Sequence, residues 1–362
     1  MSIDTLRRDI AAIDREILAL AARRMKVAEQ IGDLKREANL PIRNFRAEVD
    51  VIERAHRECE KLGLDPEVGT AISRQLIEAA VRTQHGLAVR PYQGTRKHVL
   101  VVGGAGRMGA WLAHFFASGG HTVTVLDPRG PGEGFHLGGS LQEEAPRAEV
   151  IVLATPIEQT AEILDQVVAS GAKGLVFDIC SLKSPIIGAV DRALRAGVRV
   201  ASAHPLFAPG PVLLSGRILL VCDCGDAGAA AEARALFEDT ALRIVDVPLD
   251  GHDRLMAWVL GASHAVNIAF GSMLRKSGFS VYDLDSAAST TYSRQSHTTR
   301  EVAHENPRLY YEIQHANPHM RAVYDLLEEA LAELREAAKS AASEEFERMM
   351  AANREWFDAP VP

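Results

Sequence analysis

A run of glycines directly after a short apolar segment is the feature that most restricts how this chain can fold. Residues 98–102 are HVLVV, and residues 103–109 are GGAGRMG. Gly104, Gly106 and Gly109 have the G-x-G-x-x-G spacing, in which the glycines permit a tight turn, let a phosphate approach the backbone, and let a helix pack on a strand. The spacing predicts a strand, a loop and a helix whose N-terminus holds a pyrophosphate.

An acidic residue ends the next apolar segment. Residues 122–127 are TVTVLD, and Asp127 stands where a carboxylate accepts the hydroxyl groups of an adenosine ribose. Because this carboxylate would repel a 2′-phosphate, NAD is the expected cofactor. Arg107 and Arg129 keep NADP as the alternative. Arg107 and Met108, inside the loop, join the glycines and Asp127 as expected cofactor contacts.

The distribution of apolar residues divides the chain into three parts. Residues 1–90 show helical periodicity, with helices expected at 3–36, 46–62 and 67–89. Residues 97–248 alternate strands with helices, which is typical of a doubly wound α/β domain of the Rossmann type with a parallel sheet. Residues 249–362 are again helical. The expected strands are 98–102, 122–127, 150–155, 175–179 and 198–203, with further strands expected at 217–223 and 242–247.

Composition restricts the function classes. The chain is 47% hydrophobic with a formal net charge of −8, which indicates a globular protein and argues against non-specific binding of nucleic acid or of anionic membranes. The first ten residues carry no apolar leader segment, so we expect a cytoplasmic protein. The cysteines lack metal-ligand spacing and are expected to be reduced, with no metal site: Cys59, Cys180, Cys222 and Cys224. Cys222 and Cys224, in an apolar strand-like run, are expected to be small buried hydrophobes.

One segment has the length of a membrane span. Residues 255–274 form a run of twenty residues without a formal charge. The run also holds His264, Asn267, two serines and two glycines, so a buried helix of a soluble protein is the favoured interpretation and a membrane span the alternative.

A cation interrupts the apolar seam of the first helix. Arg24 stands at the one seam position that is not apolar, and a buried arginine is costly without an anionic partner. Lys35 lies on the same face, roughly 16 Å further along the helix, so the two cations can bracket a small dianion. Arg7 lies about 25 Å before Arg24 and is rotated by about 100°, so it can reach such a pocket only in a partner chain. The seam residues are Leu6, Ile10, Ile13, Ile17, Leu20, Val27, Ile31 and Leu34.

Polar residues follow the fourth and fifth expected strands. His204 comes directly after residues 198–203, at the edge where doubly wound sheets bind ligands, and its usual pKa suits the removal of a hydroxyl proton during hydride transfer. A structural histidine that ends the strand is the alternative. Ser181, in the run DICSLK (178–183), is a second candidate at this edge.

Residues 98–360 resemble the prephenate dehydrogenase family. The resemblance is carried by GGAGRMG, ATP (154–156), DICSLK, AHPLFAPG (203–210) and GHDRLMAWVLGASHAV (251–266), with TTYSRQSHTTREVAHENPRLYYEIQ (290–314) fitting the family's second domain. It implies an NAD-dependent oxidative decarboxylation of prephenate, with Thr155 and Pro156 contacting the cofactor. It also implies that the apolar run is a buried helix of a helical dimerisation domain.

The same resemblance implies roles for individual residues. His204 would accept the proton of the ring hydroxyl, and Ser181 would hold this hydroxyl and the nicotinamide in register. Arg300 would bind a substrate carboxylate, with Arg294 as the alternative. His264 would face the pyruvyl side chain, although a histidine satisfied within the core is an equal alternative.

Residues 3–89 resemble the all-helical chorismate mutase family. The resemblance is carried by LRRDI (6–10), AARRMKVAEQIGDLK (21–35), LPIRNFRAE (40–48) and EAAVRTQ (78–84). It implies that Arg24 and a partner chain's Arg7 bind the two carboxylates of chorismate. Lys35 and Gln84 would hydrogen-bond the ether oxygen, and Glu48 would hold the hydroxyl. The chain departs from the family at Ala47, where an arginine is usual, and at Ala80, where a serine is common.

Both resemblances imply one reaction sequence, from chorismate through prephenate to 4-hydroxyphenylpyruvate, towards tyrosine. The expected protein is a homodimer with both activities, acting on small molecules and binding neither nucleic acid nor membrane. The alternative is an arogenate (cyclohexadienyl) dehydrogenase whose N-terminal helices form a regulatory dimerisation module without catalysis.

Overall fold

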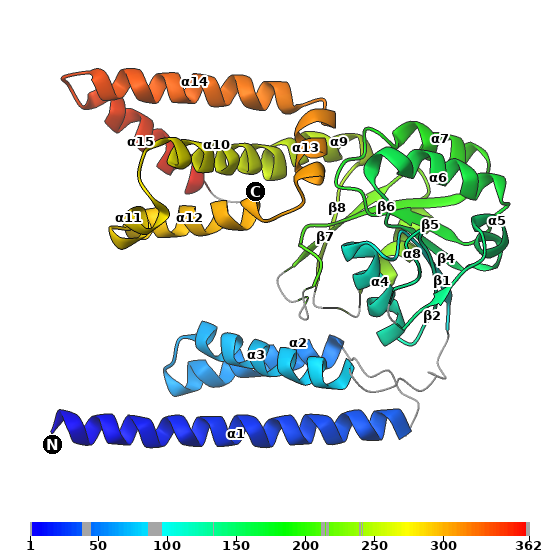
Figure 1. Cartoon of the computed structure of the whole chain (residues 1–362), viewed down its shortest axis with the longest axis horizontal. Coiled ribbons are helices and arrows are strands. Elements are labelled where there is room, and N and C mark those ends of the chain that lie inside the picture. The colour runs from blue at the N-terminus through cyan, green and yellow to red at the C-terminus, as the bar shows by residue number, and fades with distance from the viewer. Residues whose placement is uncertain are drawn as a thin grey trace. The chain divides into compact units, whose positions relative to one another are not determined.

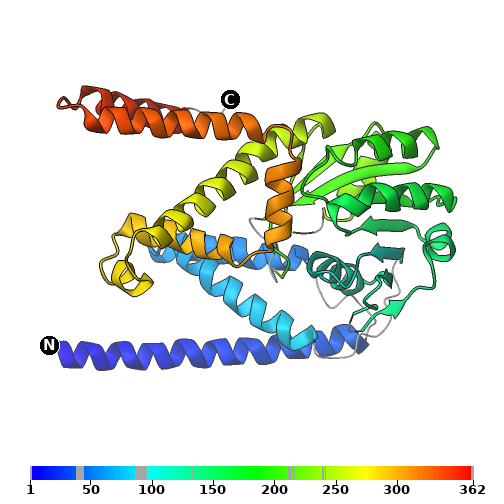
Figure 2. The ribbon, with the colours of Figure 1, turned by 45° about the horizontal axis from the view of Figure 1, so that its top comes forward.

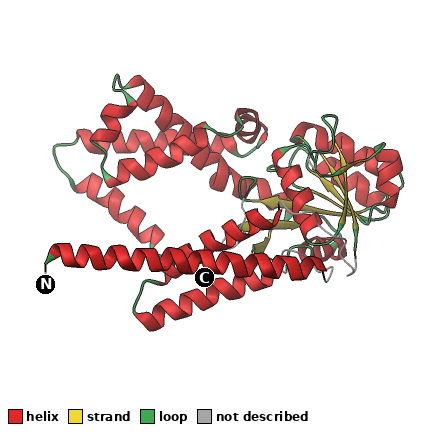
Figure 3. Ribbon diagram, turned by 60° about the horizontal axis from the view of Figure 1, so that its bottom comes forward, coloured by secondary structure: helices red, strands yellow, loops and turns green. Residues whose placement is uncertain are grey.

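The computed structural model describes residues 2–37, 45–85, 96–132, 134–210, 214, 217–238, 240 and 242–359. The chain divides into two compact units, Met1–Leu249 and Asp250–Pro362. Within the described residues, the strands are confined to the middle of the chain and helices make up the parts before and after it (Figure 3). The predicted fold class is confirmed, with a Rossmann-type sheet preceded and followed by all-α segments.

The N-terminal part consists of three helices. The first is long and uninterrupted (Figures 1 and 2), as its periodicity predicts. The other two pack against each other as an antiparallel pair, and the third also contacts the first. The helices are α1 (Ile3–Glu37), α2 (Phe45–Leu62) and α3 (Pro66–His85).

Close contact between α2 and α3 depends on one glycine. A Cβ atom at Gly69 would lie 2.5 Å from Cys59 Sγ and 3.0 Å from the carbonyl oxygen of Ala55. Two turns further along α3, Ile77 is buried against Val51 and Ile52. The pair is therefore held by a small-residue contact near its connecting turn and an apolar contact further along.

The apolar seam of α1 is exposed in the single chain. Its eight members have exposed fractions between 44% and 64%, although a solvated helix has no need of such a continuous apolar stripe. Burial of this apolar seam therefore requires contact with another polypeptide chain. The values are 44% for Leu6, 59% for Ile10, 54% for Ile13, 51% for Ile17, 63% for Leu20, 48% for Val27, 49% for Ile31 and 64% for Leu34.

The middle of the chain forms an eight-stranded sheet in the order β3-β2-β1-β4-β5-β6-β7-β8. The strands are β1 (His98–Val102), β2 (Thr122–Leu126), β3 (His136–Leu137), β4 (Val150–Leu153), β5 (Leu175–Asp178), β6 (Arg199–Pro205), β7 (Ile218–Asp223) and β8 (Arg243–Asp246). Its helices are α4 (Arg107–Ser118), α5 (Leu141–Glu144), α6 (Ile157–Ala169), α7 (Ile187–Arg195) and α8 (Ala227–Ala235), with a short 3-10 helix η1 (Ala145–Arg147).

Apolar clusters cover both faces of the sheet, which explains why the inner strands are nearly all apolar. On one face Val99 and Val101 pack with α4 and α8, where Phe116 is fully buried. On the other face Leu100 and Ile151 pack with α6 and α7. The strand order reverses between β1 and β4, so the loops after these two strands diverge and leave the position where doubly wound folds bind nucleotides.

The five strands expected to form a parallel sheet do pair in parallel, and one later pairing is antiparallel. β7 runs antiparallel to β6, with Ala203 opposite Val221 and His204 opposite Leu220. No helix occurs among the described residues between β6 and β7, and a connection without a crossover helix suits antiparallel neighbours. The short edge strand β3 was also not predicted, because its two residues carry no periodic pattern.

The C-terminal part is helical throughout its described residues. Its helices are α9 (Leu249–Met256), a π-helical turn η2 (Ala257–Ala262), α10 (Ser263–Lys276), α11 (Val281–Ser286), α12 (Thr290–Ala303), α13 (Pro307–Ala316), α14 (Met320–Lys339) and α15 (Glu344–Phe357). A small core forms where Ala257 packs against Met320 and Val323. Gly261 belongs to this contact, because a Cβ atom there would lie 2.2 Å from Met320 Sδ.

The uncharged run forms one helix from Leu249 to Lys276, which is long and apolar enough to cross a membrane. The single chain buries only 28% of its most apolar window, so the predicted burial of this helix would require a partner. Trp258 is 48% exposed, Ile268 48% and Met273 59%. Length and composition do not distinguish a membrane span from a helix that a protein partner covers.

Candidate active sites

The glycine-rich loop leaves room for a ligand at the start of α4. Gly103 follows β1 with φ of 87°, which favours glycine. A Cβ atom at Gly104 would lie 2.5 Å from Val125 Cγ1, and one at Gly109 would lie 2.2 Å from the carbonyl oxygen of Gly103. Gly106 precedes the helix without a side-chain cap, so the N–H groups of the first turn are available to a phosphate.

The loops after β1 and β4 lie together at the reversal of strand order. A Cβ atom at Gly103 would lie 2.4 Å from the carbonyl oxygen of Ala154 and 3.2 Å from Thr155 Cγ2. The Thr155 hydroxyl lies 2.8 Å from that of Thr160, and Pro156 precedes α6. Thr155 and Pro156 therefore lie in the loop that borders the glycine-rich loop, as a nucleotide site requires.

The carboxylate of Asp127 faces this loop. It accepts hydrogen bonds from the backbone N–H of Ala105 at 3.1 Å and from that of Arg129 at 2.9 Å. The Arg129 side chain adds bonds of 3.1 Å and 3.2 Å. Burial opposes the charged form of Asp127, but these hydrogen bonds outweigh it and lower the pKa. An ionised acceptor therefore stands beside the loop, although Arg129 lies close enough to contact a ligand as well. Arg107 begins α4, and Met108 packs against the core under it.

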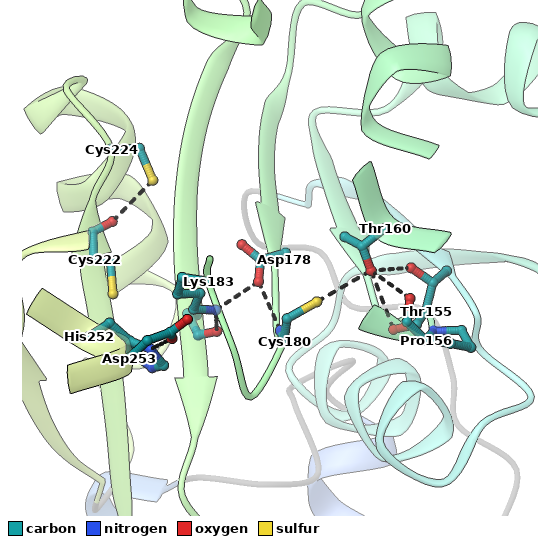
Figure 4. A network of polar contacts seen from close by, with 11 residues as sticks. Thr155, Pro156, Thr160, Asp178, Cys180, Lys183, Cys222, Cys224, His252 and Asp253 are labelled. Atoms are coloured by element: carbon teal, nitrogen blue, oxygen red, sulfur yellow. Dashed lines mark hydrogen bonds and ion pairs between the residues drawn. The ribbon is translucent and has the colours of Figure 1, made fainter. Parts of the chain in front are cut away.

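A buried ion pair joins the ends of β5 and β6 (Figure 4). Lys183 Nζ donates to Asp178 Oδ1 at 2.7 Å and to the carbonyl oxygen of Ala203 at 2.8 Å, and the lysine is fully buried. Desolvation lowers the pKa of Lys183, but the attraction of Asp178 outweighs it and raises the pKa. Ser181 lies two residues before this lysine, and His204 directly follows Ala203 with only 3% exposed. The ion pair thus connects the two segments that carry the candidate residues.

Sequence reasoning did not assign Lys183 or Asp178 a role. Both stand in the run DICSLK, but a lysine in such a run is usually solvated, and nothing local indicates that it will be enclosed. Cys222 and Cys224 are buried, as predicted, and so are Cys59 and Cys180; none of the four forms a disulfide among the described residues.

His264 on α10 is neutral in its surroundings. Its ring stacks on that of Tyr310, with centroids 4.1 Å apart and an interplanar angle of 20°. Its Nδ1 is buried and has no hydrogen-bond partner among the described residues. Burial lowers the pKa of His264 to about 4, although Glu305 partly opposes this effect. The imidazole can therefore hydrogen-bond a ligand without carrying charge, and Tyr310 is a neighbour that the sequence alone did not indicate.

A polar network holds α12 against α10. Asn267 Oδ1 accepts from Gln295 Nε2 at 2.9 Å and from Thr299 Oγ1 at 2.8 Å. The next residue, Arg300, donates from Nη2 to both carboxylate oxygens of Asp285 at 2.7 Å. Arg294 is exposed one and a half turns earlier on the same helix. Arg300 is thus oriented by an ion pair that a substrate carboxylate would have to share or replace.

In the N-terminal helices, Arg24 is the cation for which the sequence predicts an anionic partner. Its Nη1 is buried and has no hydrogen-bond partner among the described residues, and burial lowers its pKa. Burial also lowers the pKa of Lys35, while the neighbouring carboxylate of Glu48 partly opposes this effect. The fold therefore brings Lys35 and Glu48 together and leaves a desolvated guanidinium group on the same helix.

The structure describes the side chain of one of the other two mutase candidates. Arg7 is exposed near the N-terminus of α1, where its Nη1 lies 3.6 Å from Asp4 Oδ1. The side chain of Gln84 lies outside the described residues.

Three families match successive segments of the chain. Residues 6–85 match chorismate mutase type II, residues 131–244 match the prephenate dehydrogenase nucleotide-binding domain, and residues 249–352 match the prephenate dehydrogenase dimerization domain. The second match begins after the glycine-rich loop, but β1, α4 and β2 belong to the same sheet domain. Both resemblances inferred from the sequence are confirmed.

Individual proteins agree with these matches. The T-protein of Enterobacter agglomerans is 23% identical over 98% of this chain and 93% of its own length. The 4-amino-4-deoxyprephenate dehydrogenase of Streptomyces pristinaespiralis is 30% identical over 70% of this chain and 88% of its own length. The crystal structure of A. aeolicus prephenate dehydrogenase in complex with hydroxyphenyl propionate and NAD+ shares the fold, with a TM-score of 0.59 at 16% identity, and covers 74% of this chain and 100% of that one. The chain therefore belongs to the prephenate dehydrogenase family and joins this dehydrogenase to an N-terminal chorismate mutase domain.

Proposed function

We propose that the chain rearranges chorismate to prephenate in its N-terminal helices and then oxidises and decarboxylates prephenate to 4-hydroxyphenylpyruvate with NAD. The observation that carries the second activity is the edge of the sheet, where the glycine-rich loop follows β1, Asp127 follows β2, and His204 is the second-to-last residue of β6. The first activity is supported by Arg24, whose buried Nη1 has no hydrogen-bond partner among the described residues, and by Lys35 on the same helix, which interacts with Glu48.

The mutase reaction is an intramolecular rearrangement and needs no nucleophile or proton shuttle. Arg24 binds one carboxylate of chorismate, while Lys35 and Gln84 donate to the ether oxygen, where negative charge develops as its bond breaks. Glu48 accepts from the substrate hydroxyl. These groups hold the substrate in its reactive conformation and stabilise the transition state electrostatically.

In the dehydrogenase reaction, His204 accepts the proton of the ring hydroxyl. The carbon that carries this hydroxyl loses hydride, the ring carboxylate leaves as CO2, and its bonding electrons make the ring aromatic. The proton then returns from His204 to the phenolic oxygen, so the reaction needs no external acid. Ser181 orients the hydroxyl, His264 hydrogen-bonds the pyruvyl side chain as a neutral imidazole, and Arg300 or Arg294 binds a carboxylate.

The residues of the glycine-rich loop fit a dinucleotide, since side chains at Gly104 and Gly109 would collide with the loop and β2. Bound NAD supplies the hydride acceptor. The N–H groups at the start of α4 would hold its pyrophosphate, Asp127 would accept from its ribose, and Arg107, Met108, Thr155 and Pro156 would border it.

The overall proposal is tested by mixing the protein with chorismate and NAD and following NADH formation. If the chain has both activities, NADH forms from chorismate and NAD without added prephenate. Direct addition of prephenate should remove any delay before NADH appears. NADH from prephenate but not from chorismate would reduce the N-terminal helices to a non-catalytic module. A preference for arogenate over prephenate in kcat/KM would assign the dehydrogenase to the other substrate.

Cofactor choice gives a prediction of its own. We expect kcat/KM for NAD to exceed that for NADP by at least about 10-fold, because the ionised Asp127 repels a 2′-phosphate. Asp127→Asn should lower this preference for NAD over NADP. Arg129→Ala is the matched control, because it also removes the ion pair between the two residues but keeps the Asp127 carboxylate. If the native protein prefers NADP, then Arg107 or Arg129 governs the pocket instead.

We also propose a homodimer in which each mutase site draws Arg7 from the partner chain. The exposed apolar stripe of α1 supports this arrangement, because two such helices packed antiparallel would cover each other. It would also bring the exposed Arg7 of one chain beside Arg24 of the other. The apolar helix Leu249–Lys276, mostly uncovered in the single chain, would supply a second interface.

A complementation experiment tests the shared site. Arg7→Ala and Arg24→Ala homodimers should each lack mutase activity, while a heterodimer contains one site with both substitutions and one with neither. Equal mixing with subunit exchange should therefore restore about a quarter of the native mutase activity. An active monomer, or verified exchange without recovery, contradicts the shared site.

A further inference from the structure

The N-terminal helices hold a second buried guanidinium nitrogen without a hydrogen-bond partner among the described residues, on an arginine that the sequence did not single out. Four buried side-chain nitrogen or oxygen atoms lack a hydrogen-bond partner among the described residues, and two of them are Arg24 Nη1 and Arg74 Nε. A buried, unsatisfied cationic donor costs free energy, so its retention in both cases requires a reason.

Arg74 lies on the inward face of α3. It follows Thr70 by four residues and precedes Ile77 by three, which places all three on one stripe of the helix. Thr70 and Ile77 are each only 5% exposed. Arg74 therefore points its stem along the packed side of α3, unlike a typical solvated arginine on the surface of a helix.

The level of Arg74 along the bundle follows from the contacts of neighbouring residues. Ile77 packs on Val51 in the antiparallel pair, so Ala80 is level with Glu48, which interacts with Lys35 of α1. Arg74 then lies about 9 Å below the level of Lys35, because α3 rises about 1.5 Å per residue.

Arg24 lies further in the same direction. It precedes Lys35 by about 16 Å on α1, and α1 and α3 run the same way and contact each other (Figures 1 and 2). Arg74 therefore lies at a level between Arg24 and Lys35.

Of these three cations, Lys35 has the carboxylate of Glu48 as a neighbour. The position next to it, where a cation would be usual in the family it resembles, is Ala47. Cations placed at successive levels around one interior are complementary to a small molecule with two carboxylates.

We propose that Arg74 is a further substrate-binding residue of the mutase site, which donates from its guanidinium group to a carboxylate of chorismate and supplies the positive charge that Ala47 lacks. The inference rests on the proposed mutase function. It goes beyond that function by assigning the third cation to α3.

The test uses the full-length protein with Arg74→Met, which keeps the apolar stem, and Arg74→Lys, which keeps the charge. Arg57→Met is the matched control, because Arg57 is exposed on α2 and pairs with Glu53 at 3.6 Å. Mutase kcat and KM are measured with chorismate at low and high ionic strength. Dehydrogenase activity with supplied prephenate and the Tm report the integrity of each variant.

We expect Arg74→Met to lower mutase kcat/KM by about 10- to 100-fold, mainly through KM, and Arg74→Lys to recover part of the loss. The salt dependence of kcat/KM should become weaker in Arg74→Met, because a charged contact has been removed. Its Tm should not fall, since a buried unpaired cation has gone.

Two outcomes would overturn the inference. A native kcat/KM in Arg74→Met would remove Arg74 from the site, and a lowered Tm with equal losses in both variants would make it structural. Failure of the native protein to convert chorismate would instead contradict the proposed mutase function, so the two failures are distinguishable.

Discussion

Replacing Arg24 with alanine should abolish the rearrangement of chorismate and leave the oxidation of prephenate intact. The guanidinium group is desolvated and has no protein partner among the described residues, so a substrate carboxylate is its expected counterion. Its loss should lower mutase kcat/KM by at least about 10²-fold, the range for removing one partner of a desolvated charge pair. Chorismate disappearance and, with supplied prephenate, NADH formation are followed separately in the same preparation.

Arg23→Ala is the matched control for this variant, because Arg23 is exposed on the same turn of α1. It should keep both activities. A parallel loss of both activities in Arg24→Ala would show that the two reactions share one site, and the two-domain interpretation would then be wrong. Retention of full mutase activity would return Arg24 to the class of structural arginines.

Replacing His204 with asparagine should lower the turnover of prephenate by at least about 10²-fold, as the loss of a general base does. Asparagine keeps a hydrogen-bonding group of similar size but cannot take up the hydroxyl proton. Binding of NAD and prephenate should therefore persist, and kcat should fall far more than KM rises. Mutase activity should not change, because His204 belongs to the sheet domain.

The pH profile distinguishes a base from a structural histidine. The native kcat should decline at low pH as the base becomes protonated, and this limb should disappear in His204→Asn. His121→Asn is the control, since His121 precedes β2 at the opposite, amino end of the strands. Near-normal turnover with an unchanged profile in His204→Asn would support the structural alternative.

Several features follow from local sequence alone. The glycine-rich loop was predictable because glycine is needed where a Cβ atom would collide with backbone close by in the sequence. At Gly109 such an atom would lie 2.2 Å from the carbonyl oxygen of Gly103. The long first helix and the central strands were equally predictable, because their apolar periodicity extends over neighbouring residues. The partnerless Arg24 was also foreseen, since a charge within an apolar seam is visible in the sequence.

Other features depend on residues that are far apart in the chain. The antiparallel β7, the enclosure of Lys183 by Asp178 and Ala203, and the stacking of Tyr310 on His264 have no local signature. The buried Nε of Arg74 on α3 likewise has no local signature, because the burial of a single side-chain atom depends on how the helices pack.

The sequence by itself therefore determined the order of domains, the nucleotide loop and the residue types available for chemistry, because these depend on spacing and backbone sterics between near neighbours. Only the tertiary structure decided which of those residues are desolvated, which carry a protein counterion, and which apolar faces remain uncovered. Burial and pairing are set by segments that meet across the fold, and they control the pKa of a group and its readiness to bind a charged ligand.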